Sequence, residues 1–496
     1  MIRNIARFSG CLALLGLIAL ITGCRLGCHS ELRDDPRQTT PLLLVSIDGF
    51  RYDYLDHFET PALDRLARDG LRADSLHQVF PTKTFATHYS LVTGLHPGTH
   101  GVVANNMWDP RRQSRFSLRD REAVSDGYWY QGGEPIWVTA ERQRLITATY
   151  FWPGSEACIG RVRPTYWKPY DGRVAHAERI DQILDWLDLP PDQRPAFLTL
   201  YFSAVDSAGH RGGPLSEMTR AAVADVDGHL GDLLDALEAD NRLDAINIIV
   251  VSDHGMSDVD TQRSILLNEL IDLTGLNISD WGPAAQIWTG ARDPQDLVAE
   301  LREAHPHLRA WRRDEIPARY HFGSHRRVPD VLVEADPGWL ITAAPFAAND
   351  RSPPLGMHGW DPALAEMHGV FIARGPDFIA GTRSPAVHSV DLYALMAELL
   401  DLQPAEHEGR LEAFSPYLGD GPAPAYRAER FDCRSEIVEA RIGAQHMALH
   451  IGEFIHVLDR VGDGHFEAVD LAFEIDGETA GGRVDGRSLE GCRRLP

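Results

Sequence analysis

The sequence predicts an α/β protein with a doubly wound, mostly parallel sheet. Three apolar runs of strand length each lead to an aspartate: residues 41–50 (PLLLVSIDGF), 197–210 (FLTLYFSAVDSAGH) and 245–255 (AINIIVVSDHG). Segments with the apolar spacing of helices separate these runs. Continuous apolar runs are typical of strands buried on both faces, and strands that alternate with helices predict a parallel sheet.

The remaining elements follow the same alternation. Helices are expected at residues 60–70, which end at a glycine, and over about 216–238. A strand at 368–376 and a helix at 390–402 complete the series. Residues of about 276–345 differ, because short strand patterns there flank one helical stretch, DPQDLVAELREAHP. This segment is expected to form a small α+β cap inserted into the domain.

Both ends of the chain fall outside this domain, which is expected to span residues 41–424. Residues 1–23 contain two arginines and a short apolar stretch, the pattern of a signal peptide. The ending ITGC is similar to a bacterial lipobox. It predicts an exported lipoprotein, periplasmic or anchored in the outer membrane through lipidated Cys24, with 24–40 as a polar tether. An ordinary signal peptide with a stray cysteine is the alternative. Residues 425–496 form a C-terminal extension for which the sequence predicts no fold.

The cysteines and the net charge limit the further possibilities. Export would place the chain where disulfides form. Cys433 and Cys492, both in the extension, are expected to pair, whereas Cys28 and Cys158 are expected to stay unpaired. The net charge of −24 opposes binding to the backbone of long nucleic acids, because such binding depends on basic residues that neutralise phosphates. The sequence does not predict an oligomeric state.

Acidic side chains at the ends of three predicted strands indicate a metal site. The carboxyl ends of parallel strands meet at one edge of a sheet, where ligands bind. Carboxylates gathered there would repel each other unless cations lay between them. Histidines accompany them, and a mixed set of aspartate and histidine ligands suits zinc better than magnesium or calcium. The candidate ligands are Asp48, Asp206, Asp253, His210, His254 and His358.

Thr84 is the candidate nucleophile. It follows the Phe-Pro break in FPTKTFATHYSLVTG, residues 80–94, and is expected in the first turn of a helix. Free backbone N–H groups and the positive end of the helix dipole favour an anion there. A metal-bound threonine would be substantially deprotonated and could attack phosphorus. Taken alone, Thr84 can also be read as a simple helix cap.

A series of motifs makes the comparison with a known family specific. IDGFR, FPTKTF, HYSLVTGLHPGTHGVVANNMWDP, WPGSEA, RPTYWKPYDG, DSAGHRGGP, VSDHGM and GMHGWD occur in this order over about residues 41–400. They resemble the motifs of nucleotide pyrophosphatase/phosphodiesterases of the alkaline phosphatase superfamily. The resemblance implies an alkaline phosphatase-like domain with two Zn²⁺ per chain and Thr84 as a metal-bound nucleophile. One zinc would fall on Asp206, His210 and His358, and the other on Asp48, Asp253 and His254.

The resemblance also implies substrate-binding residues. Asn105 matches an asparagine that binds a phosphate oxygen. Phe85 and Tyr170 match two rings between which a nucleobase stacks, and Tyr201 is expected to line the same pocket. Two departures, FATHYS for the more usual FPNHYS and Trp360 for a tyrosine, touch no ligand and bear on substrate detail only. Lys83, His77, His88 and His100 are expected to have structural roles.

The activity implied is zinc-dependent hydrolysis of nucleotide phosphodiester or pyrophosphate bonds through a phospho-threonine, with release of nucleoside 5′-monophosphates. The partner would be a small nucleotide or another phosphodiester. Three alternatives stay open: a phosphodiesterase acting on lysophospholipid or glycerophosphocholine, a phosphonoacetate hydrolase, and a non-catalytic zinc-binding surface lipoprotein.

Overall fold

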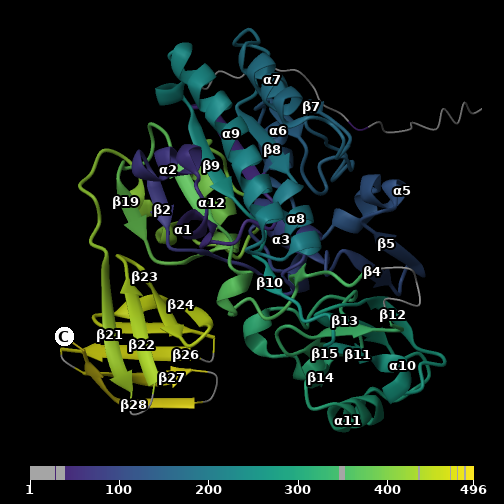
Figure 1. The fold of residues 1–496 in the computed structure, drawn as a ribbon. Helices are drawn as coiled ribbons and strands as arrows, with labels where there is room; N and C mark the ends of the chain where they lie inside the picture. Colours follow the sequence, from purple (N-terminus) through teal and green to yellow (C-terminus); the bar gives the residue numbers. More distant parts are fainter. Residues whose placement is uncertain are drawn as a thin grey trace, which may run out of the picture.

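The centre of the molecule is an eight-stranded mixed sheet (Figure 1). The structure is a computed structural model that describes residues 28, 39–345, 352–433, 436–469, 471–477, 479–484 and 487–495. In spatial order the strands are β19 (Thr382–Ser384), β2 (Leu71–Ala73), β18 (Phe371–Arg374), β9 (Asn247–Val251), β1 (Leu42–Ile47), β8 (Phe197–Phe202), β6 (Thr147–Tyr150) and β7 (Tyr166–Trp167). The strands from β9 to β7 are parallel, and β18 is antiparallel to both of its neighbours. The predicted α/β class with a mostly parallel sheet is confirmed.

Helices cover both faces of this sheet, which explains the continuous apolar runs. On one face, Leu43 and Val45 of β1 pack in a core with α2 (Pro61–Arg68), α7 (His176–Leu187) and α9 (Glu217–Ala239). On the other face, Leu42 and Leu44 share a core with α3 (Thr84–Thr93), α6 (Ile136–Arg142) and α12 (Leu392–Leu399). Successive side chains of a strand point to opposite faces, so a strand covered on both sides must be apolar throughout.

Shorter elements connect these layers. The helices are α1 (Tyr54–His57), α4 (Pro97–His100), α5 (Arg121–Ser125), α8 (Ala204–Gly212) and α10 (Leu267–Leu270). The strands are β3 (Leu76–His77), β4 (Asn106–Asp109), β5 (Ser114–Ser117), β10 (Ser257–Asp258), β11 (Ser264–Leu266), β16 (Leu340–Thr342), β17 (Gly356–Met357) and β20 (Val387–His388).

A four-stranded antiparallel sheet with one helix occupies the segment where a cap was expected. Its strands lie in the order β12 (Asn277–Asp280), β13 (Ala284–Trp288), β15 (Val331–Ala335) and β14 (Leu308–Arg312). Asp293 caps the start of helix α11 (Pro294–Ala304), because its carboxylate accepts from the N–H of Gln295. The first residue of the helix is a proline. Both features stabilise a helix start. The buried leucines of α11 pack on this sheet and form a separate small core.

The C-terminal extension forms a closed antiparallel barrel, shown in yellow in Figure 1. Its strands are β21 (Arg427–Cys433), β22 (Glu436–Ile442), β23 (His446–Ile451), β24 (Phe454–Gly462), β25 (His465–Ala468), β26 (Leu471–Asp476), β27 (Thr479–Val484) and β28 (Arg487–Arg494). Its interior is filled by apolar side chains such as Phe431 and Phe473. The expected Cys433–Cys492 disulfide is present and joins β21 to β28.

The expectation that Cys28 and Cys158 stay unpaired is wrong. The two cysteines form a disulfide across 130 residues of sequence. Cys28 lies in a polar stretch without periodicity, so no local pattern could place it beside Cys158. The predicted signal peptide 1–23, the lipidation site Cys24 and the rest of the predicted tether, apart from Cys28 and residues 39 and 40, lie outside the described residues. In the parts of the chain that are described, no helix has the length and apolar character needed to cross a membrane.

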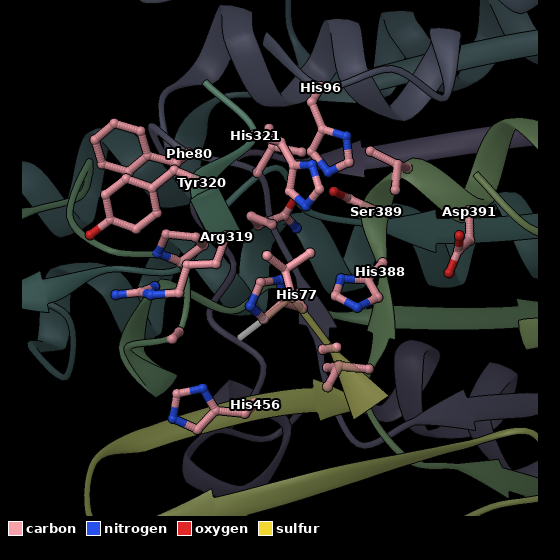
Figure 2. Close-up of a pocket in the computed structure, with 18 of the residues that line it drawn as sticks. His77, Phe80, His96, Arg319, Tyr320, His321, His388, Ser389, Asp391 and His456 are labelled. Atoms are coloured by element: carbon pink, nitrogen blue, oxygen red, sulfur yellow. The ribbon is translucent and has the colours of Figure 1, made fainter. Parts of the chain in front are cut away.

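A cavity of about 280 Å³ lies where the barrel meets the α/β domain (Figure 2). Histidines from several elements line it, including His77 of β3, His388 of β20 and His456 of β24. The rings of His77 and His388 lie 4.9 Å apart, edge to face. None of the candidate metal ligands lines this cavity. These histidines therefore lie at the junction between the two parts and apart from the candidate metal ligands.

Candidate active site

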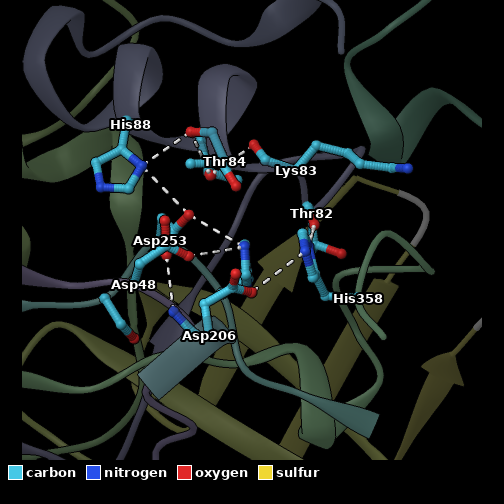
Figure 3. Close-up of polar contacts among 12 residues, drawn as sticks. Asp48, Thr82, Lys83, Thr84, His88, Asp206, Asp253 and His358 are labelled. Carbon is cyan, nitrogen blue, oxygen red and sulfur yellow. Dashed lines mark hydrogen bonds and ion pairs between the residues drawn. The ribbon is translucent and has the colours of Figure 1, made fainter. Parts of the chain in front are cut away.

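Three neighbouring parallel strands bring the acidic side chains together, as Figure 3 shows. Asp48 directly follows β1, and Asp253 lies two residues beyond β9. Asp206 is the third residue of α8, the helix that follows β8. Gly49 makes the approach possible, because a Cβ atom there would lie 2.8 Å from the Cα of Asp206. Its φ of +70° is also in the left-handed region that glycine tolerates. The Gly49 N–H donates to Asp253 Oδ1 at 3.2 Å, which ties two of the strand ends together.

The histidines complete two overlapping groups. Asp48, Asp253 and His254 offer ligand atoms within 4.8 Å of one another, and so do Asp206, His254 and His358. His254 Nε2 lies 3.4 Å from Asp48 Oδ1 and 3.1 Å from Asp253 Oδ2. His210 Nε2 lies 3.1 Å from Asp206 Oδ1, and His358 Nε2 lies 3.6 Å from that same oxygen. All six candidate ligands therefore lie in one cluster.

Backbone contacts fix which ring nitrogen of each of the three histidines faces the carboxylates. The Nδ1 atoms of His210, His254 and His358 each contact a carbonyl oxygen at 2.7–2.9 Å. A carbonyl oxygen only accepts, so Nδ1 donates the hydrogen bond in each ring, and Nε2 is the nitrogen that is left to bind a cation. Those are the atoms that face the carboxylates. A backbone contact of this kind is how proteins orient metal-binding histidines.

The carboxylates lack the hydrogen bonds that burial would require. Asp48 Oδ1, Asp206 Oδ1 and Asp253 Oδ2 are buried and have no hydrogen-bond partner among the described residues, and neither has His254 Nε2. Burial raises the pKa of Asp48, and repulsion from Asp253 and Asp206 raises it further. Buried polar atoms without partners are costly. Four such atoms that face each other fit a site for divalent cations.

Thr84 is the first residue of α3 and lies at the edge of this cluster (Figure 3). His88, one turn further along α3, connects the two. Its Nδ1 contacts the Thr84 carbonyl oxygen at 2.9 Å and Asp253 Oδ2 at 3.2 Å, and its Nε2 contacts Ser46 Oγ at 2.8 Å. His88 thereby links the helix start to a carboxylate of the cluster, a contact that its position in the sequence did not indicate.

Asn105 lies at the same helix start. Its Oδ1 accepts from the N–H of Phe85 at 2.8 Å, so the amide NH₂ is its remaining polar group. The neighbouring Asn106 is engaged differently: it donates to Asp280 Oδ1 and accepts from Ser117 Oγ. Of the two adjacent asparagines, Asn105 is the one tied to the residue after Thr84.

The two tyrosines play different parts. The Tyr201 hydroxyl donates to Asp48 Oδ2 at 2.5 Å, so this side chain supports a candidate ligand. Its ring lies 5.9 Å from that of Tyr170, edge to face. Tyr170 is 38% exposed, and its hydroxyl lies 2.9 Å from Ser203 Oγ. The ring of Phe85 packs against Phe116 on the helix side of the site.

Lys83 connects the site to the inserted sheet. Its buried ammonium lies 3.3 Å from Asp280 Oδ2 and donates to the Trp281 carbonyl oxygen at 3.2 Å. Asp280 thus contacts Lys83 and Asn106, the sequence neighbours of Thr84 and Asn105. Sequence reasoning assigned no role to Asp280, and nothing in its local sequence could have indicated one. His77 lines the cavity next to the barrel, and His100 Nε2 contacts Ser90 Oγ at 2.8 Å.

Fold and site together define a class: an alkaline phosphatase-like α/β enzyme with a metal-binding cluster at the carboxyl edge of its sheet. Residues 42–361 match the family model described as "Type I phosphodiesterase / nucleotide pyrophosphatase". The chain belongs to this family. The family resemblance predicted from the motifs is thereby confirmed.

Relatives cover most of this chain. Human ectonucleotide pyrophosphatase/phosphodiesterase family member 1 is 36% identical over 75% of the chain, and the match spans 41% of that longer protein. Bis(5′-adenosyl)-triphosphatase enpp4 of Xenopus laevis is 35% identical over 79% of this chain and 85% of its own length. Among solved structures, murine ectonucleotide pyrophosphatase/phosphodiesterase 5, an inactive threonine-to-alanine variant in complex with AMP, has a TM-score of 0.73 and 34% identity. The match covers 77% of this chain and 100% of the murine chain.

The expectation of a bacterial lipoprotein, periplasmic or anchored through Cys24, is wrong. The relatives named above come from animals, and so does a venom phosphodiesterase of Crotalus durissus collilineatus, 34% identical over 383 residues. The error came from a four-residue pattern. Small residues before a cysteine are a weak signal, because any apolar leader can end in them.

Proposed function

We propose that this chain hydrolyses nucleotide phosphodiester and pyrophosphate bonds with Thr84 as nucleophile and two zinc ions as cofactors. The observation that carries the proposal is the set of buried, unpartnered ligand atoms beside the start of α3, where Thr84 lies. The AMP bound to a related structure supports a nucleotide substrate.

The donor set suits two zinc ions. Asp206, His210 and His358 would hold one, and Asp48, Asp253, His254 and Thr84 the other. Aspartate oxygens and neutral histidine nitrogens are ligands that zinc prefers. When bound, the pair would lower the pKa of the Thr84 hydroxyl and neutralise charge on the entering and leaving oxygens.

The residues of the chain would act in a double displacement. The Thr84 Oγ–P bond forms as the bond from phosphorus to the leaving oxygen breaks, and the leaving group departs with that oxygen. In this first step the Thr84 hydroxyl loses its proton to solvent, and the phospho-threonine keeps the nucleoside as a diester. Water then attacks the same phosphorus: its O–P bond forms as the bond from phosphorus to Thr84 Oγ breaks, the nucleoside 5′-monophosphate leaves, and the proton from water restores the Thr84 hydroxyl. The Asn105 amide NH₂ would donate to a non-bridging phosphate oxygen, and the free N–H groups at the start of α3 would favour the same charge.

Aromatic rings would select nucleotides over simple phosphates. Phe85 directly follows Thr84, and Tyr170 lies beside Tyr201, which itself supports Asp48. Two rings that sandwich a base contribute roughly 1 to 3 kcal/mol per stacked base. The Tyr201 ring would pack against Tyr170, and its hydroxyl would donate to Asp48.

The test is turnover of p-nitrophenyl thymidine 5′-monophosphate by Thr84→Ala. Thr93→Ala is the matched control, because Thr93 ends the same helix and its hydroxyl donates to a backbone carbonyl of that helix. We expect Thr84→Ala to lose at least a thousandfold in kcat and Thr93→Ala to stay within a few-fold of the parent. Full turnover by Thr84→Ala would overturn the proposal. Turnover of glycerophosphocholine but of no nucleotide by the parent would refute the substrate class and leave the nucleophile in place.

A further inference from the structure

A second cluster of metal-binding side chains lies on the outer face of the phosphodiesterase-like domain, away from the active site. His176 is the first residue of α7, and Asp225 and His229 lie on α9. The two helices are side by side over one face of the sheet (Figure 1). Each of the three residues offers a ligand atom, and these atoms lie within 4.8 Å of one another. We propose that His176, Asp225 and His229 form a zinc site that joins α7 to α9.

The spacing on α9 suits a metal. Asp225 and His229 are four residues apart, and side chains at that spacing lie one turn apart on the same face of a helix. His176 approaches from the neighbouring helix, with its Nδ1 2.8 Å from Asp225 Oδ2. The ring centres of His176 and His229 lie 5.5 Å apart. Ligand atoms around a tetrahedral zinc are about 3.3 Å apart, given zinc–ligand distances of about 2.0 Å, so ligand atoms that lie within 4.8 Å of one another would have to move closer by about 1.5 Å at most.

His229 contacts the backbone through the same ring nitrogen as the histidines in the active site. Its Nδ1 contacts the Asp225 carbonyl oxygen at 2.7 Å, so Nδ1 carries the proton and Nε2 has the lone pair. His210, His254 and His358 have the same contact with backbone carbonyls. Nε2 is therefore the nitrogen of His229 that is left to coordinate a cation.

The surroundings favour a cation that binds neutral imidazole. Burial lowers the pKa of His176 and the nearby Arg179 guanidinium lowers it further, and together these outweigh the opposite effect of Asp225. The net charge of −24 concentrates cations at the surface of the protein. Two histidines and one carboxylate suit zinc better than magnesium or calcium, and three protein ligands leave a fourth position for water.

A metal at this site would stabilise the packing of α7 and α9 against the strand that leads to the active site. The His176 ring packs edge to face against Phe202, with ring centres 4.9 Å apart. Phe202 ends β8, the strand that leads to Asp206. A metal bound by α7 and α9 would thus fix two covering helices relative to β8. The alternative is a plain His176–Asp225 hydrogen bond with no metal, and the two readings predict different zinc contents.

The experiment measures bound zinc in the full chain. The protein is stripped with a chelator, equilibrated by dialysis against buffered free Zn²⁺, and analysed by inductively coupled plasma mass spectrometry. His229→Gln and, separately, His176→Ala remove one ligand each. His465→Gln is the matched control, because His465 is also partly exposed and lies 2.9 Å from a carboxylate, that of Glu467. Thermal midpoints with and without added zinc provide a second measurement.

We expect the parent and His465→Gln to hold one more zinc per chain at saturation than either ligand variant. Any zinc in the active site is common to all four proteins and cancels in this difference, so the result does not depend on the proposed catalytic function. The parent should also gain more in thermal midpoint from zinc than the ligand variants do. Equal zinc content in the parent and both ligand variants would overturn the site. If one variant fails to fold, the other decides.

Discussion

Replacing Tyr201 by phenylalanine should weaken metal binding without disturbing the fold. The Tyr201 hydroxyl donates to Asp48 Oδ2 at 2.5 Å, and Asp48 is only 2% exposed. The other oxygen, Asp48 Oδ1, has no hydrogen-bond partner within the described chain and faces the cluster. A hydrogen bond to a buried charged group contributes about 1.5 to 3 kcal/mol. Losing such a partner of a metal ligand costs roughly 10- to 100-fold in metal affinity, which agrees with that energy.

The assay is zinc affinity measured by competition with a chromogenic chelator. Tyr54→Phe is the control, because Tyr54 is also buried and its hydroxyl has no hydrogen-bond partner in the part of the chain that is described. We expect Tyr201→Phe to bind its weakest zinc about 10- to 100-fold less tightly and Tyr54→Phe to match the parent. Unchanged affinity in Tyr201→Phe, with the fold intact by circular dichroism, would refute the view that Tyr201 supports a ligand.

Three further predictions concern the substrate, acid stability and the metals. Asn105→Ala should lower kcat about 100-fold or more with a smaller change in KM, measured on the p-nitrophenyl ester, because its donor acts on charge that develops during reaction; a pure KM effect would contradict this. Burial lowers the pKa of His388 to about 3, whereas the unfolded value is about 6.5. The unfolded chain therefore binds a proton at His388 more readily than the folded chain does. The contribution of His388 to the free energy of unfolding is complete above about pH 6.5 and is smaller by about 2 kcal/mol at pH 5. Urea titrations at both pH values should show a smaller loss in His388→Gln than in the parent, and an equal loss would refute this. Finally, chelation should lower the thermal midpoint, because it leaves the buried carboxylates without counter-charge; an unchanged midpoint would contradict a metal cluster.

The strands and the candidate ligands could be predicted because their signals are local. Asp48 and Asp253 each follow an apolar run, and a parallel sheet brings such strand ends to one edge whatever the rest of the chain does. His358 lies far along the chain; its sequence made it a candidate ligand, but only the family motifs grouped it with Asp206. The structure brings it within 3.6 Å of Asp206.

Contacts between distant segments could not be predicted in this way. Asp280 reaches Lys83 and Asn106 only because the inserted sheet folds back onto the active site. The Cys28–Cys158 disulfide could not be predicted either, because the sequence around each cysteine gives no sign of its partner. The barrel is a different case: residues 436–442, EIVEARI, bury every second side chain from Val438 onward. That alternation was present in the sequence and predicts a strand covered on one face.

The stereochemistry at phosphorus tests the central claim most directly. Each in-line displacement inverts phosphorus, so attack by Thr84 followed by attack by water must return the original configuration. A nucleotide phosphorothioate diester of known configuration is hydrolysed in ¹⁸O-labelled water, and the configuration of the product is determined by ³¹P NMR. The account predicts net retention. Net inversion would show that water attacks the substrate directly, and it would contradict a phospho-threonine at position 84.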